Sequence, residues 1–187
     1  MGNIYLVGFM GTGKTAVGKE LAKIKKWRFV DLDELIELRN KRSISDIFAK
    51  EGEPYFRRIE KQTLKEVAGE KKFVVACGGG IVIDKDNIRI MKDTGIMICL
   101  AASPEVILER TSLGAHRPLL NVAEPKKQIE LLLKLRAPYY ALADKTIDTS
   151  KLSIKEVVDK IIKLTSPKVK LKTKKAKVKT KLKSFRK

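Results

Sequence analysis

Apolar runs alternate with longer amphipathic stretches along most of the chain, and this alternation indicates the fold class. Five short runs are expected to be strands, at residues 4–7, 28–32, 73–77, 96–100 and 146–148. Several are apolar at successive positions, as strands are when helices cover both faces of a parallel sheet. The stretches between them carry apolar residues at helical spacing, such as Val17, Leu21 and Ile24. Strands that alternate with helices predict an α/β fold of three layers.

Two serines mark the expected starts of helices. Ser43 opens the sequence Ser-Ile-Ser-Asp, which is typical of a capping box in front of a short helix. Ser153 can cap the last helix of the pattern. The expected buried stripe of that helix consists of Val157, Val158, Ile161 and Ile162.

A phosphate-binding loop follows the first expected strand. Residues 8–15 read Gly-Phe-Met-Gly-Thr-Gly-Lys-Thr, which fits G-x-x-x-x-G-K-[ST] between a strand and a helix at residues 16–26. The glycines let backbone N–H groups approach phosphate oxygens, and the helix directs its N-terminus at the anion. Lys14 is expected to reach the β- and γ-phosphates and Thr15 to bind Mg²⁺. The pattern therefore predicts that a nucleoside triphosphate binds here.

Two carboxylates stand where the second expected strand ends. Asp31 and Asp33 are two apart, so in a strand they share a face at the edge where ligands of α/β sheets bind. One could lie near Mg²⁺ and the other could accept a proton from an attacking hydroxyl. The alternative is an aspartate that caps a helix beside a solvated turn.

Further charged and glycine positions could complete an acceptor site. Arg57 and Glu60 are three apart on an expected helix, so Glu60 could orient the guanidinium, although a surface ion pair has the same spacing. Residues 78–80 are three glycines behind a strand. They permit close approach of the backbone to a substrate, or else form a tight turn.

Two further arginines could contact anions. Arg117 lies in an expected lid at residues 111–120 and could close over the γ-phosphate. Arg136 lies near the end of an expected helix and could complete a clamp on an anionic substrate.

Together these motifs resemble the shikimate kinase family, whose order they follow over roughly residues 2–164. The matching signatures are the phosphate loop, Asp31-x-Asp33, Phe56-Arg57-x-x-Glu60, Gly78-Gly79-Gly80, Arg117-Pro118-Leu119-Leu120 and Arg136-x-Pro138-x-Tyr140. The resemblance implies ATP-dependent phosphorylation of the 3-hydroxyl of shikimate to shikimate 3-phosphate, in aromatic amino-acid biosynthesis. It also implies a five-stranded parallel sheet flanked by helices, of the P-loop NTPase type.

The resemblance also implies roles on the acceptor side. Asp33 corresponds to the carboxylate that binds and activates the hydroxyl. Arg57 and Arg136 correspond to a clamp on the shikimate carboxylate. Gly79 and Gly80 correspond to backbone contacts with shikimate.

On the donor side the resemblance implies an ATP site with Mg²⁺. Lys14 and Arg117 correspond to stabilisers of phosphate charge and, with Asp33, form the expected catalytic set. Thr15 and Asp31 correspond to the Mg²⁺ site. The expected nucleotide-binding residues are Gly11, Thr12, Gly13, Lys14, Thr15, Ala16, Arg110 and Arg117. Residues 149–152 correspond to the adenine-side loop but lack the Asn and Pro that are often found there.

Charge divides the 187 residues into two parts. The net charge is +19, yet residues 167–187 alone hold 11 Lys or Arg and no acidic residue. Residues 1–166 carry 30 basic and 22 acidic residues, a net charge of +8. We therefore expect a kinase-like domain at residues 1–166 and a basic, disordered tail at residues 167–187.

Other features limit the remaining function classes. Cys77 and Cys99 lie in apolar runs and are expected to be reduced core residues. No stretch is long and apolar enough to span a membrane, and no signal segment precedes the first strand, so we expect a cytoplasmic protein. The resemblance implies a monomer.

Two alternatives remain at this stage. One is another small-molecule kinase of the same architecture, acting on gluconate or a nucleoside monophosphate. The other is a nucleic-acid-binding protein with a nucleotide switch, supported only by the basic tail. That tail has one aromatic residue, Phe185, so we expect no specific nucleic-acid partner but, at most, salt-sensitive binding of polyanions.

Overall fold

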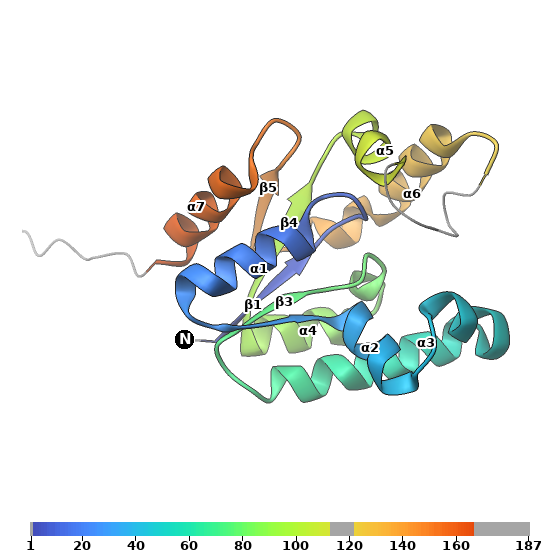
Figure 1. The fold of residues 1–187 in the computed structure, drawn as a ribbon, viewed down its shortest axis with the longest axis horizontal. Coiled ribbons are helices and arrows are strands. Elements are labelled where there is room, and N and C mark those ends of the chain that lie inside the picture. The colour runs from blue at the N-terminus through green and yellow to red at the C-terminus, as the bar shows by residue number, and fades with distance from the viewer. Residues whose placement is uncertain (1, 113–121, 167–187) are drawn as a thin grey trace, which may run out of the picture.

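The computed structural model describes residues 2–112 and 122–166. Its centre is a parallel five-stranded sheet in the order β2-β3-β1-β4-β5 (Figure 1). The strands are β1 (Asn3–Val7), β2 (Arg28–Asp31), β3 (Phe73–Ala76), β4 (Gly95–Ala101) and β5 (Lys145–Asp148). Residues 113–120 of the expected lid, with Arg117, and the expected tail at residues 167–187 lie outside the described residues, whereas Thr111 and Ser112 are the last two residues of a helix.

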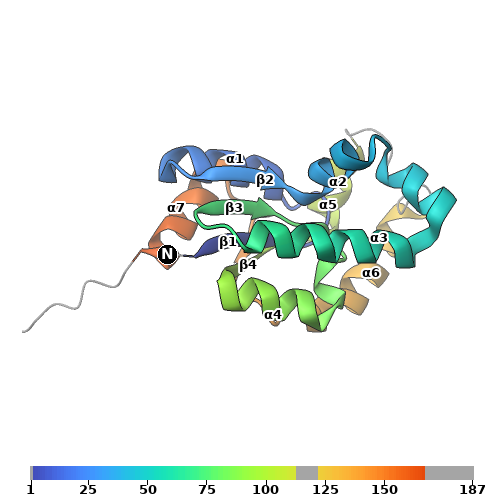
Figure 2. The same ribbon diagram turned by 90° about the horizontal axis from the view of Figure 1, so that it is seen from below.

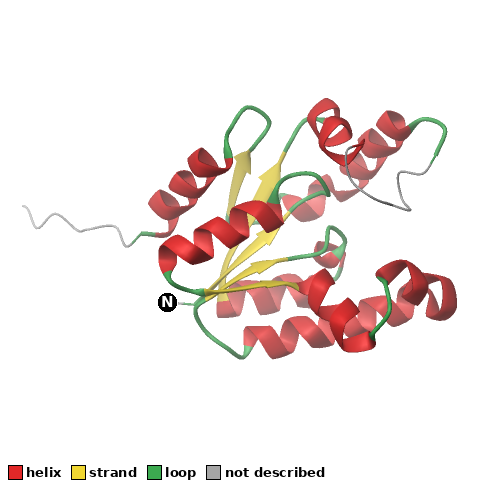
Figure 3. Cartoon of the chain, viewed as in Figure 1, coloured by secondary structure: helices red, strands yellow, loops and turns green. Residues whose placement is uncertain are grey.

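Helices cover both faces of the sheet, as Figures 2 and 3 show. They are α1 (Lys14–Lys25), α2 (Leu32–Asn40), α3 (Ile44–Ala68), α4 (Lys85–Thr94), α5 (Pro104–Ser112), α6 (Pro125–Tyr140) and α7 (Ile154–Thr165), with a short 3₁₀ turn η1 (Ile81–Ile83). The predicted three-layer α/β fold is confirmed.

The period-two pattern of β1 assigns residues to two cores. Ile4 and Leu6 pack with α1 and α7 on one face, where Val17, Leu21 and Val158 are fully or almost fully buried. Tyr5 and Val7 point to the other face, against α3, α4, α5 and α6. Both faces of the central strand are apolar because both are covered. The expected helical residue Ile24 is instead half exposed, and Ala22 is buried in its place.

A smaller apolar cluster holds α2 and the first half of α3 together. Ile36, Ile47 and Phe56 form its buried centre. Gly52 interrupts α3 with φ 81° and ψ 169°, a conformation that glycine adopts without a Cβ penalty. Pro54 stands two residues after Gly52, in the first turn after the interruption, where a missing N–H costs little. The helix expected to be short therefore continues to Ala68 beyond a kink.

The two expected serine caps are present and differ in kind. Ser153 and Glu156 form a full capping box in which each side chain accepts from the other residue's backbone N–H. Ser43 accepts from the N–H of Asp46, whose carboxylate bonds the Ser43 hydroxyl instead of the backbone. Aspartate is one methylene shorter than glutamate, which accounts for the incomplete box.

The strand expected at residues 28–32 ends one residue early. α2 begins at Leu32, because the Asp31 side chain caps it by accepting from the Asp33 N–H at 3.1 Å. Asp31 and Asp33 therefore do not share a strand face, and the helix-cap alternative is correct for Asp31. Both cysteines are buried and unpaired, as expected. Within the described part of the chain, no helix is long and apolar enough to cross a membrane.

The capping box of α7 gives a stability prediction. Replacing Ser153 with Ala removes the hydroxyl that accepts from the Glu156 N–H and donates to the Glu156 carboxylate, so the free energy of unfolding should fall by about 1 kcal/mol in urea denaturation. Ser45→Ala is the control, since Ser45 is exposed within α3, and it should leave stability nearly unchanged. An equal effect of both substitutions would contradict the assignment of the cap.

Candidate active site

The phosphate loop joins β1 to α1 and is shaped by its glycines. Gly8, Gly11 and Gly13 have φ of 135°, 75° and 90°. A Cβ on Gly8 would lie 2.1 Å from the carbonyl oxygen of Leu100, so only glycine fits between β1 and β4. Gly13 precedes the first turn of α1, which is therefore directed into the loop.

Lys14 and Thr15 stand at the start of α1 as the motif predicts. The Lys14 ammonium donates to the carbonyl oxygens of Gly8 and Phe9 at 2.9 and 2.8 Å, which holds it over the loop. The Thr15 hydroxyl donates to Oδ2 of Asp31 at 2.7 Å. Asp31 therefore reaches the phosphate loop from β2 although it does not share a strand face with Asp33.

Arg110 ties the loop after β5 to the phosphate loop. Its guanidinium donates to the hydroxyl of Thr149 at 3.2 Å and to the carbonyl oxygen of Thr149 at 3.0 Å. It also donates to the carbonyl oxygen of Gly11 at 3.3 Å. Thr149 in turn donates to the carbonyl oxygen of Thr12 at 3.2 Å. The three segments expected around the nucleotide are thus brought together.

The three glycines at residues 78–80 let charged side chains approach the backbone behind β3. A Cβ on Gly78 would lie 2.7 Å from Oε1 of Glu60 and 2.9 Å from Oδ1 of Asp33. A Cβ on Gly80 would lie 2.5 Å from Nη2 of Arg57. The glycines also form the turn that leads into η1, as the turn alternative expects, and the approach of a substrate to them stays a prediction.

Arg57 and Glu60 form a partly buried ion pair and not a surface pair, since the Arg57 side chain is 29% exposed. Nη1 of Arg57 donates to Oε2 of Glu60 at 2.9 Å, and the Glu60 side chain is 1% exposed. Glu53 accepts from Nε and Nη2 of Arg57 at 3.0 and 2.9 Å. Sequence reasoning missed Glu53, although its position four residues before Arg57 is the helical spacing of such pairs.

Arg136 and Tyr140 complete the cluster from α6. The Arg136 guanidinium lies over the Phe9 ring, 5.6 Å from its centroid. The Tyr140 hydroxyl donates to the carbonyl oxygen of Gly79 at 2.7 Å, and burial raises the pKa of Tyr140 to about 12. The sequence analysis matched Tyr140 as part of the Arg136-x-Pro138-x-Tyr140 signature but assigned it no contact, although it shares a helix face with Arg136 at i+4.

The phosphate loop and the glycine turn are in direct proximity. A Cβ on Gly79 would lie 3.5 Å from the carbonyl oxygen of Gly8 and 3.4 Å from Nη1 of Arg136. The donor loop and the cluster around residues 78–80 therefore face one shared space. A molecule held by the cluster would be next to a phosphate held by the loop.

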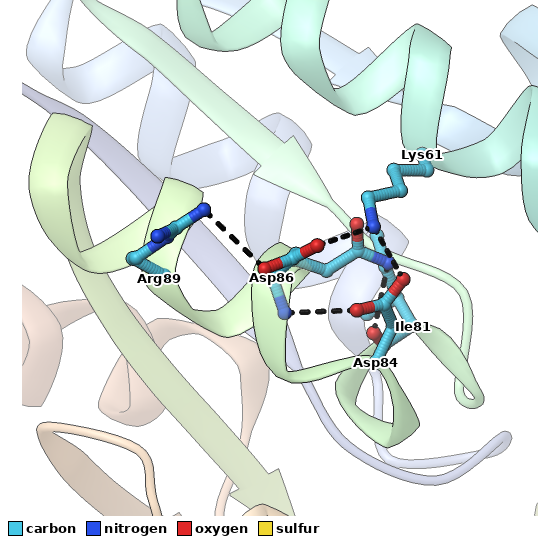
Figure 4. A network of polar contacts seen from close by, with 6 residues as sticks. Lys61, Ile81, Asp84, Asp86 and Arg89 are labelled. Carbon is cyan, nitrogen blue, oxygen red and sulfur yellow. Dashed lines mark hydrogen bonds and ion pairs between the residues drawn. The ribbon is translucent and has the colours of Figure 1, made fainter.

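A polar network fixes the far side of the glycine turn to α3 (Figure 4). Lys61 donates to Asp84 at 3.0 Å and to Asp86 at 2.7 Å. Asp84 caps α4 through the Asp86 N–H, and the Asn87 amide donates to the carbonyl oxygen of Ile81 at 3.1 Å. These contacts hold η1, and with it Gly80, against the helix that carries Arg57.

Burial changes the acidity of two carboxyls in the cluster. It raises the pKa of Asp33 to about 6, helped by the charge of Asp31 and opposed by Lys14. It raises the pKa of Glu60 to about 7, opposed by Arg57. Oε1 of Glu60 has no hydrogen-bond partner within the described residues. Buried carboxyls with raised pKa values in a polar cleft are characteristic of catalytic sites.

The residues proposed for a metal are oxygen donors beside the loop. Thr15 and Asp31 offer a hydroxyl and a carboxylate, which suits Mg²⁺ because this ion keeps several waters and phosphate ligands. Among residues 2–112 and 122–166, no group of three or more His, Cys, Asp or Glu is arranged to hold a metal by itself. Thr15 and Asp31 therefore suit a metal ion that also has phosphate oxygens and waters as ligands.

Comparisons with known proteins agree with this geometry. The family model described as shikimate kinase matches residues 10–166. A shikimate kinase of Thermoanaerobacter pseudethanolicus is 47% identical over 163 residues, which cover 87% of this chain and 95% of that protein. One of Thermodesulfovibrio yellowstonii is 48% identical over 163 residues, covering 87% and 94%.

Solved structures show the same likeness. The chain resembles a shikimate kinase of Acinetobacter baumannii in complex with shikimate, with a TM-score of 0.84 and 40% identity over 88% of this chain and 92% of that one. It also resembles a shikimate kinase of Aquifex aeolicus, with a TM-score of 0.73 and 33% identity over 87% and 94%.

The raised pKa of Glu60 predicts how stability depends on pH. The carboxyl binds its proton more tightly in the folded state than in the unfolded state, where the pKa is near 4.5. Its contribution is therefore complete below about pH 4.5 and is lost as pH rises through about 7. Between pH 5 and 8, the stability of the wild type relative to Glu60→Gln should fall by about 2–3 kcal/mol.

Urea denaturation at several pH values measures this difference. Glu66→Gln is the matched control: Glu66 lies on the same helix, and its bond to Arg39 lowers its pKa. Parallel pH profiles for the wild type and Glu60→Gln would show that Glu60 is not protonated in the folded state near neutral pH.

Proposed function

The chain belongs to the shikimate kinase family, and we propose how its residues divide the work of the family's reaction. The protein transfers a phosphoryl group from ATP to shikimate, giving shikimate 3-phosphate and ADP in aromatic amino-acid biosynthesis. One observation carries the assignment of roles: Asp33, Arg57 and Arg136 converge on the turn at residues 78–80, which adjoins the phosphate loop.

The acceptor binds at the glycine turn in this proposal. Arg57 and Arg136 contact the shikimate carboxylate, since a guanidinium matches a carboxylate with two parallel donors. The backbone at Gly79 and Gly80 contacts the ring hydroxyls. These contacts hold the 3-hydroxyl toward the phosphate loop, and positioning of this kind supplies much of the catalysis of phosphoryl transfer.

Asp33 activates the hydroxyl. Its raised pKa of about 6 leaves it mostly ionised at neutral pH, yet more basic than an ordinary aspartate. It accepts the proton as the 3-hydroxyl oxygen bonds to the γ-phosphorus and the bond from that phosphorus to ADP breaks. The Tyr140 hydroxyl supports this geometry by fixing the Gly79 carbonyl.

The nucleotide binds along residues 11–16 with its phosphates at the N-terminus of α1. Lys14 contributes a positive charge to the transferred phosphoryl group, and Ala16 lies exposed at the first turn. Arg110 lies beside the loop after β5 and flanks the adenine. Arg117 lies outside the described residues, and its role as a second phosphate-charge stabiliser stays a prediction.

Thr15 and Asp31 would hold Mg²⁺, Asp31 through a water. The ion neutralises charge on the phosphates when it is bound. The Asp31 carboxylate accepts from Thr15 and from the Asp33 N–H, whereas the Asp33 carboxylate lies beside Gly78. The two carboxylates can therefore have different roles although they are close in sequence.

Localisation, oligomeric state, domain limits and the role of the tail belong to the same proposal. We expect a cytoplasmic monomer with a kinase domain at residues 1–166, which agrees with a family match that ends at residue 166. We expect any binding of polyanions to reside in residues 167–187 and to weaken with salt.

An acceptor panel tests the function together with the role of Asp33. ADP release should be fast with shikimate and absent with gluconate or a nucleoside monophosphate. Asp33→Asn should lower kcat about 10²–10⁴-fold, since it removes the proton acceptor and keeps the shape of the side chain. Glu34→Gln, an exposed neighbour paired with Lys19, is the control and should retain activity.

Two results would overturn these assignments separately. Turnover of gluconate or a nucleoside monophosphate, with none of shikimate, would contradict the substrate. Full shikimate turnover by Asp33→Asn would contradict only the role of that residue.

The Mg²⁺ assignment predicts a change in metal requirement. Asp31→Asn keeps the cap of α2, because asparagine caps as well as aspartate, but removes the charge. The Mg²⁺ concentration for half-maximal activity should rise about 10–100-fold. Asp84→Asn changes the equivalent cap of α4 and serves as control. An unchanged Mg²⁺ requirement in Asp31→Asn would exclude Asp31 from the metal site.

A further inference from the structure

The guanidinium of Arg57 is enclosed by two carboxylates and a glycine. Glu60 accepts from Nη1, and Glu53 accepts from Nε and Nη2. The end of the group that carries Nη1 and Nη2 lies against Gly80, where a Cβ would be 2.7 Å from Nη1 and 2.5 Å from Nη2. One face lies toward the ring of Phe56, 5.2 Å from its centroid. A carboxylate that arrives from solution therefore meets an edge of Arg57 that is already bonded.

The two carboxylates differ in what their release would cost. The Glu60 side chain is 1% exposed, so separating it from Arg57 would leave a charge buried without its partner. The Glu53 side chain is 59% exposed and returns to water when it is released. Exposed ion pairs at this helical spacing contribute little to stability. Glu53 is therefore the partner that Arg57 can exchange.

The contact between Glu53 and Arg57 is also of a weaker kind than a ligand could offer. A single oxygen, Oε1 of Glu53, accepts from both Nε and Nη2. A free carboxylate can meet the same edge with two oxygens in parallel bonds, which is the stronger geometry.

The charges around Arg57 also favour the release of Glu53. Asp33, Glu53 and Glu60 face Arg57, and Arg136 is the second cation near Glu60. Adding an acceptor carboxylate would place a further negative charge beside Glu53. Release of Glu53 to solvent relieves that repulsion.

We propose that Glu53 is an internal competitor that occupies the Nε–Nη2 edge of Arg57 until the carboxylate of the acceptor displaces it. This rests on the proposed function, in which Arg57 binds the shikimate carboxylate. Glu53 directly follows the kink at Gly52, in the first turn of the continued helix, where a carboxylate remains favourable after it leaves Arg57. Glu53 thus sets the affinity for the acceptor without touching the reacting atoms.

Calorimetric titration with shikimate tests the proposal in the full-length chain. Glu53→Gln should bind shikimate about three- to five-fold more tightly, because the competitor is weakened. KM for shikimate should fall by a similar factor while kcat stays unchanged. Shikimate methyl ester, which lacks the anionic carboxylate, should bind the wild type and Glu53→Gln equally.

Two further variants separate contact from general charge. Glu51→Gln removes a charge two residues away, from a residue that pairs with Arg42, and should leave shikimate affinity unchanged. Glu53→Asp keeps the charge but shortens the reach, so it should also tighten binding.

The sign of the effect decides the outcome. Weaker or unchanged binding of shikimate by Glu53→Gln would overturn the proposal, and weaker binding would mean that Glu53 supports Arg57. An equal gain for the methyl ester, or for Glu51→Gln, would overturn it as well. Failure of the proposed function would be distinct: the wild type would not bind shikimate, or Arg57→Met would bind it as tightly as the wild type.

Discussion

The absence of side chains at residues 78–80 is the constraint on which the site depends. Any Cβ at Gly78 or Gly80 would lie less than 3 Å from the carboxylate of Glu60 or the guanidinium of Arg57. Because glycine has no Cβ, the partly buried ion pair of Arg57 and Glu60 on α3 can pack directly on the turn behind β3. The same turn is fixed from the other side by Tyr140 and by the network around Lys61. The turn at residues 78–80 is thereby held in place and forms a surface beside Arg57.

That surface connects the acceptor to the donor. The Gly79 turn faces the carbonyl of Gly8, and Arg136 lies over the ring of Phe9 within the phosphate loop. The two loops follow neighbouring parallel strands, β3 and β1, whose carboxyl ends meet at one edge of the sheet. Parallel topology therefore gives the proximity that in-line transfer needs, and α2 and α3 supply the carboxylates and the arginine.

The sequence predicted the parts of the site that depend on local pattern. The phosphate loop, the pairing of Arg57 with Glu60 and the five strands follow from spacing alone. The prediction that Asp31 and Asp33 share a strand face was wrong. The Asp31 side chain caps α2, so β2 ends at Asp31 and Asp33 lies in the helix. The contacts of Tyr140 and Lys61 were not predicted, since they join different elements, and Glu53 was missed although it lies four residues before Arg57 on the same helix. The depth of burial that raises the pKa of Glu60 is likewise a property of packing and not of spacing.

If shikimate binds on the glycine turn beside Arg57, nuclear magnetic resonance should locate it there. On titration with shikimate, the largest shifts should occur at the backbone amides of Gly79 and Gly80 and at the Nε–H of Arg57. A separate cavity of ≈ 300 Å³ at the other end of the strands, lined in part by Asn3, Trp27 and Gly95, should show none. Shifts confined to that cavity, or unchanged resonances at Arg57 and the glycine turn under saturating shikimate, would show that shikimate does not bind on the glycine turn.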